Sequence, residues 1–95
     1  MYIGRVCPRY GKWGGFQWSG GEWNCDKATT KWGVPPIDEM DSLFKQHDFD
    51  MRHGIPYPHT NLCQHLTGIA PPEEIYGKVY RYACIGIFYL LSKFE

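Results

Sequence analysis

The hydrophobic and polar positions between residues 38 and 53 repeat with the period of an amphipathic helix. Counted at 100° per residue, the apolar side chains of this segment gather within about 60° of His47. They are Met40, Leu43, Phe44 and Met51. Asp48 lies about 100° further round. We therefore expect His47 to face the apolar seam and Asp48 to reach a target at its edge.

A second long helix is predicted over residues 73–93. Pro72, Glu73 and Glu74 suit its first turn. Its apolar residues recur at steps of three and four and predict a core stripe of Ile75, Val79, Tyr82, Ala83, Gly86, Ile87 and Leu90. The pattern therefore predicts a mainly α fold, in which two long antiparallel helices pack together and an N-terminal loop lies across one end.

The remaining segments read as loops. Residues 1–34 are rich in Gly and Trp, with a short strand or hairpin expected between Phe16 and Trp23. Residues 54–71 contain Pro56, Pro58, Gly68 and Pro71 and are expected to form a connector with one helical turn over 61–66.

Composition narrows the class of protein. The chain has 95 residues, which is the size of one small domain, with a core that is marginal without staples, metal or a partner surface. Lysines and arginines balance aspartates and glutamates at ten each, so the charge expected of a nucleic-acid binder is missing. Aromatic residues reach 17%, which favours a folded domain with an interfacial surface. No stretch has the length of a transmembrane span.

The four cysteines do not determine whether the protein resides in an oxidising or a reducing compartment. Cys7, Cys25, Cys63 and Cys84 allow two disulfides in any of three pairings, or four free thiols. Disulfides would suit an exported domain, but no recognisable secretory peptide precedes this one.

A glycine-rich loop over residues 10–21 is the candidate metal site. Dense glycines let backbone carbonyls turn inward, and calcium takes carbonyl oxygens together with a carboxylate. Asp48 would supply that carboxylate. The motifs here are Pro36-Ile37-Asp38-Glu39-Met40-Asp41 with His47-Asp48 at a fixed offset, and Trp13-Gly14-Gly15-Phe16-Gln17 followed by Trp18-Ser19-Gly20-Gly21.

These motifs resemble the secreted-type phospholipase A2 superfamily, in a compact branch found in phage, viral or microbial proteins. The resemblance covers residues 10–53. It implies that the whole chain is one phospholipase A2-like domain, with a calcium loop over 10–21, a His-Asp helix over 38–53 and a second long helix over 73–93. It also implies hydrolysis of the sn-2 ester of glycerophospholipids.

The resemblance assigns roles to particular residues. His47 would be the general base that activates water, and calcium would be held by Asp48 and the carbonyls of Trp13, Gly15 and Gln17. The Gly15 amide would be a second donor to the oxyanion. Trp18 and Trp23, as exposed aromatics, would contact the membrane interface.

One element of the family pattern is missing. Many members place an aspartate on the second long helix to orient the histidine, and this chain has no aspartate after Asp50. Tyr76, Tyr80 and Tyr82 are the candidates to orient His47 in its place. His53, His59 and His65 are expected to be ordinary surface or connector residues.

Two other functions compete with the enzyme. The first is a catalytically silent phospholipase-like module that binds a membrane or a protein partner. The second is a small interaction domain stabilised by zinc, using Cys63 and His65 with Cys7 or Cys25. The expected partner of the enzyme is a phospholipid surface, and the expected setting is secreted or virion-associated.

Overall fold

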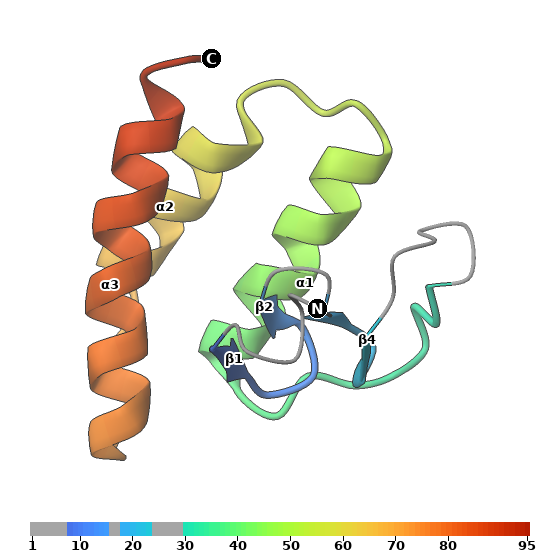
Figure 1. Cartoon of the computed structure of the whole chain (residues 1–95), viewed down its shortest axis with the longest axis vertical. Coiled ribbons are helices and arrows are strands. Elements are labelled where there is room, and N and C mark those ends of the chain that lie inside the picture. The colour runs from blue at the N-terminus through green and yellow to red at the C-terminus, as the bar shows by residue number, and fades with distance from the viewer. Residues whose placement is uncertain (1–7, 16–17, 24–29) are drawn as a thin grey trace, which may run out of the picture.

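Three helices and two short hairpins make up the part of the chain that the computed structural model describes, residues 8–15, 18–23 and 30–95 (Figure 1). The helices are α1 (Glu39–Arg52), α2 (Pro58–Gly68) and α3 (Ile75–Ser92). Strand β1 (Arg9–Tyr10) pairs antiparallel with β2 (Gly14–Gly15), and β3 (Trp18–Ser19) pairs antiparallel with β4 (Glu22–Trp23). The hairpin expected before Trp23 is confirmed, and the one formed by β1 and β2 is additional.

Helix α1 begins and ends within one residue of the predicted bounds. Asp38 is its N-cap, and the Asp38 carboxylate accepts a hydrogen bond of 2.8 Å from the Asp41 amide. Glu39 and Asp41 place acids in the first turn, where the positive end of the helix favours them.

Helix α2 is longer than the single turn expected in the connector. Pro58 occupies its first position, where the missing amide hydrogen costs nothing. Tyr57 precedes it with a positive φ of 57°, which turns the chain into the helix. Leu62 and Leu66 are its buried side chains. Pro58 therefore starts a helix within a segment that was predicted to be a connector.

Helix α3 is confirmed within two residues at its start and one at its end, but its predicted core stripe is wrong. Every residue of that stripe is exposed, including Val79, Tyr82 and Leu90. The buried residues are Gly77 and Cys84, and Tyr80, Ile85 and Phe88 pack partly buried beside the core. The helix thus turns the face opposite to the predicted one toward the protein.

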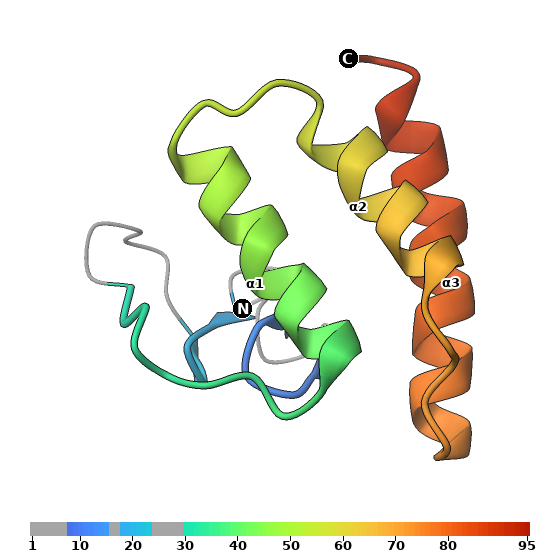
Figure 2. The same cartoon turned by 180° about the vertical axis from the view of Figure 1, so that it is seen from behind.

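The predicted pairing of the two long helices is also corrected. Helices α2 and α3 are antiparallel, because Thr60 near the start of α2 contacts Glu95 and Leu66 near its end contacts Arg81. Helices α1 and α3 run in the same direction, because Phe44 contacts Tyr80 and the later residue His47 contacts the later residue Phe88. Helix α2 is therefore the antiparallel neighbour of both long helices, as the connections in Figures 1 and 2 also show.

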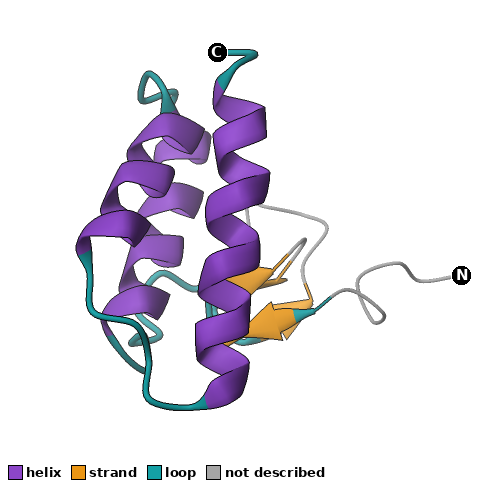
Figure 3. Cartoon of the chain, turned by 90° about the vertical axis from the view of Figure 1, so that its left-hand side faces the viewer, coloured by secondary structure: helices purple, strands orange, loops and turns teal. Residues whose placement is uncertain are grey.

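One cluster of buried side chains joins the β1–β2 hairpin to the three helices. Its buried side chains are Tyr10, Trp13, Met40, Phe44, Leu62, Leu66 and Cys84. The strands lie beside the helices rather than beyond their ends (Figure 3). None of the helices in the described chain combines the length and apolar character needed to span a bilayer.

Candidate functional site

The glycine-rich loop is held against the start of α1 by one buried carboxylate. Asp41 is fully buried and accepts hydrogen bonds from the backbone amides of Lys12, Trp13 and Ile37, at 2.9, 2.9 and 3.0 Å. A Cβ at Gly11 would lie 2.5 Å from the Asp41 carboxylate, and Gly11 has a positive φ of 56°. The loop can approach Asp41 this closely because residue 11 has no side chain.

The second part of the loop packs along α1. A Cβ at Gly14 would lie 2.9 Å from the Phe44 ring. The Trp18 indole donates a 2.9 Å hydrogen bond to the Gly11 carbonyl, and only 8% of Trp18 is exposed. The expectation that Trp18 is an exposed aromatic is therefore wrong. The Trp23 backbone pairs with Trp18 in β3 and β4.

Asp48 joins the loop to the helix. Its side chain is 21% exposed, and its Oδ2 accepts a 2.7 Å hydrogen bond from the hydroxyl of Ser19. The sequence predicted that Asp48 would reach a target beside the apolar seam, and that target includes the loop. Ser19 was not among the predicted site residues, although it lies in the Trp-Ser-Gly-Gly motif.

His47 lies inside the helical layer, as predicted. Its side chain is 11% exposed, and its ring meets the Phe88 ring edge to face at a centroid distance of 4.9 Å. Nδ1 lies 4.0 Å from Oδ1 of Asp48. Nε2 lies 3.0 Å from Nδ1 of His59, which is hydrogen-bonding distance. The two ring nitrogens therefore face different neighbours.

His59, expected to be an ordinary residue, is the functional candidate that the sequence did not indicate. It lies in the first turn of α2, where its amide donates a 2.9 Å hydrogen bond to Glu95. Glu95 also accepts hydrogen bonds of 2.9 Å from the amide and hydroxyl of Thr60. Desolvation opposes ionisation of Glu95, but these hydrogen bonds hold its pKa below the usual range.

The structure places the three tyrosines proposed to orient His47 as follows. The Tyr76 hydroxyl donates to the Arg9 carbonyl, and the Tyr80 hydroxyl lies 3.5 Å from the Pro8 carbonyl. Tyr82 is 80% exposed. His59 is a ring partner at hydrogen-bonding distance from His47.

The oxygen atoms of Asp48 and of the loop backbone are of the kind that calcium takes. The Ser19 hydrogen bond shows that the Asp48 carboxylate reaches the loop that carries the Trp13 and Gly15 carbonyls. Carboxylate and backbone carbonyl oxygens suit a hard cation. Gln17, the third expected carbonyl donor, lies outside the described residues.

The two cysteines that the structure describes are free thiols. They are Cys63 and Cys84, and the Cys63 thiol lies 3.7 Å from the Ile85 carbonyl. Across residues 8–15, 18–23 and 30–95, no three His, Cys, Asp or Glu side chains form a group able to hold a metal ion. Cys7 and Cys25 lie outside these ranges.

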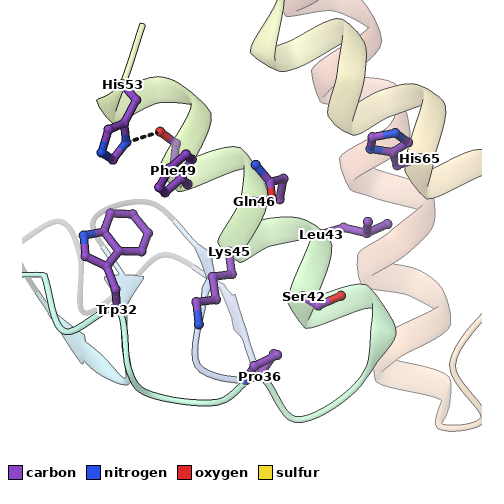
Figure 4. A pocket seen from close by; sticks show the side chains of 9 residues that line it. All are labelled: Trp32, Pro36, Ser42, Leu43, Lys45, Gln46, Phe49, His53 and His65. Atoms are coloured by element: carbon purple, nitrogen blue, oxygen red, sulfur yellow. Dashed lines mark hydrogen bonds between the residues drawn. The ribbon is translucent and has the colours of Figure 1, made fainter. Parts of the chain in front are cut away.

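A groove of about 770 Å³ follows a different side of α1 (Figure 4). It is lined by Trp32, Pro36, Ser42, Leu43, Lys45, Gln46, Phe49, His53 and His65. His53 is engaged there by its own helix, since its Nδ1 lies 2.9 Å from the Phe49 carbonyl. His47 and Asp48 do not line this groove.

Comparison of the chain with protein-family models, with curated proteins and with solved structures gives no match.

Proposed function

We propose that the chain is a calcium-dependent hydrolase of the phospholipase A2 type, which cleaves the sn-2 ester of glycerophospholipids. The observation that supports it best is the placement of the two nitrogens of His47. Nδ1 lies on the side of Asp48, whose carboxylate binds the glycine loop, and Nε2 is held by His59. A base held beside a candidate cation ligand is the arrangement that metal-assisted ester hydrolysis needs.

The proposed chemistry starts at Nδ1 of His47. This nitrogen takes a proton from a water molecule while the water oxygen forms a bond to the sn-2 carbonyl carbon. The protonated ring then gives the proton to the leaving glycerol oxygen as the ester bond breaks, so the products are a fatty acid and a lysophospholipid. The Gly15 amide is the proposed second donor to the oxyanion.

Calcium would be held by Asp48 and the carbonyls of Trp13, Gly15 and Gln17. When bound, the ion would polarise the ester carbonyl and stabilise the negative charge that develops on its oxygen. The contribution of the chain is to fix the carboxylate beside the loop, through Ser19 and Asp41.

The test uses vesicles of mixed zwitterionic and anionic phospholipids with different acyl chains at sn-1 and sn-2. Free fatty acid is identified by mass spectrometry, with calcium and with excess chelator, for the wild type and for His47→Gln. We expect calcium-dependent release of the sn-2 chain, reduced about 10²- to 10⁴-fold by His47→Gln. The control is His53→Gln, an exposed histidine at the C-cap of the same helix, which should retain activity.

One result would contradict the proposed activity, and another would contradict the role of His47. Folded wild type that binds calcium but releases no fatty acid would favour the catalytically silent module, and vesicle binding would then be measured. Full activity of His47→Gln would exclude this residue as the base. Circular dichroism in the same samples detects a zinc-stabilised domain, because such a domain unfolds on chelation.

A further inference from the structure

The His47 and His59 rings form a pair in which one nitrogen must donate and the other must accept. In the first arrangement His47 Nε2–H donates to His59 Nδ1. In the second, His59 Nδ1–H donates to His47 Nε2, so the proton of His47 must move to Nδ1. The 3.0 Å distance is compatible with both.

The chemistry of imidazole favours the first arrangement. It places both neutral rings in the Nε2–H form, which is the tautomer that free histidine prefers in water. The second arrangement places both rings in the less favoured Nδ1–H form. Only the first leaves a lone pair on Nδ1 of His47, which is the nitrogen on the Asp48 side.

The His59 ring is positioned by Phe88 and by the hydrogen bond of its own backbone amide. The Phe88 ring of α3 stacks on it at a centroid distance of 5.5 Å and meets His47 edge to face. The backbone of His59 is fixed by its hydrogen bond to Glu95. A ring whose position is fixed in this way sets the orientation of the ring it binds.

We propose that His59 is the positioning residue of His47: by accepting the Nε2 proton, it holds His47 in the tautomer and orientation of a general base. This inference rests on the proposed function. When His47 takes a proton from water at Nδ1, its Nε2–H continues to donate to His59, and His59 stays neutral. A neutral acceptor thus takes the place of a carboxylate in orienting the base.

The experiment replaces His59 by a side chain that keeps the acceptor and by one that removes it. In His59→Asn the amide oxygen occupies nearly the position of Nδ1, because both atoms are bonded to Cγ. His59→Leu has no acceptor. His65→Gln, an exposed position of the same helix, is the control. Each variant is assayed for kcat and KM on the vesicles, and the tautomer of His47 is read from its ring ¹⁵N shifts by NMR.

We expect His59→Leu to lower kcat about 10²-fold with little change in KM, and to shift His47 from the Nε2–H form to a mixture. His59→Asn should retain kcat within about tenfold of the wild type and keep the Nε2–H form. Equal losses in the two variants with no change of tautomer would overturn the proposal, since they would show a structural role for residue 59 alone. Undiminished kcat in His59→Leu would overturn it as well.

The NMR measurement separates this inference from the proposed function. If the wild type releases no fatty acid, the proposed function fails, and the ring ¹⁵N shifts still decide whether His59 sets the tautomer of His47. An Nδ1–H form in the wild type would overturn the positioning role whatever the activity.

Discussion

At the scale of single residues, Asp41 is the group on which the loop depends most. A carboxylate with no solvent exposure is costly unless hydrogen bonds replace its hydration. Three backbone amides do so, and two of them belong to Lys12 and Trp13 in the loop. The same side chain thus stabilises the first turn of α1 and fixes the loop beside it.

We predict that Asp41→Asn destabilises the fold by about 2–4 kcal/mol. Asparagine keeps one acceptor oxygen, but its amide group would face a backbone N–H that has lost its partner. Urea unfolding followed by circular dichroism measures the loss. Glu39→Gln, an exposed acid in the same turn, is the control and should stay within about 0.5 kcal/mol of the wild type. Equal stability of the two variants would contradict the anchoring role of Asp41.

His59 shows why a part of the site was not predicted. The motif around His47 and Asp48 is local, so its spacing could be read from the chain. His59 lies twelve residues beyond His47, across a turn, and a single histidine carries no periodic signal. Its contact depends on how α2 folds back on α1, which is a property of tertiary packing.

At the scale of elements, the existence of a helix was easier to predict than its buried face. Helix α1 has one apolar stripe, which predicted its extent, and the structure adds Asp38 as its N-cap. Helix α3 is apolar almost all round, with a second set of suitable side chains in Tyr80, Cys84 and Phe88. Periodicity cannot distinguish between two apolar faces of one helix. The packing of α2 against α3 determines which face is buried. The full length of α2 was not predicted, because Pro56, Pro58, Gly68 and Pro71 together indicate a connector.

The reversed face of α3 gives a prediction with two matched leucines. Leu66 of α2 has 0% of its surface exposed, whereas Leu90 of the outward face has 62% exposed. Leu66→Ala should cost about 2–5 kcal/mol of unfolding free energy, because it removes buried methyl groups and leaves a cavity. Leu90→Ala should cost less than about 0.5 kcal/mol. A large loss from Leu90→Ala in the monomer would mean that this face is covered.

At the scale of the whole molecule, the core is sensitive to alkaline pH. Burial raises the pKa of the Cys84 thiol from about 9 to about 12. Burial and then the hydrogen bond to Asp38 also raise the pKa of Tyr10. Both groups are neutral when protonated, so the unfolded chain ionises them at lower pH than the folded chain does. Their contribution to stability is complete below pH 9 and is lost as the pH rises toward 12.

We therefore predict that the urea concentration at half unfolding decreases as the pH is raised from 9 to 11. In Cys84→Ala this decrease should be smaller. Cys63→Ala, which removes the partly exposed thiol, is the control and should leave the slope unchanged. The comparison concerns slopes, since each substitution also changes packing. A slope that is the same in Cys84→Ala and the wild type would exclude the thiol as a source of the pH dependence.

The packing of Tyr10 against α3 has a consequence for how the protein is made. Tyr10 contacts the rings of Tyr76 and Tyr80, and Glu95 fixes the start of α2. A ribosome delivers the loop and His47 well before these residues leave its exit tunnel. Both sides of the candidate site therefore lack these supports until residues 76–95 have left the tunnel. The proposed activity would therefore begin only after α3 has been made and has packed against the loop.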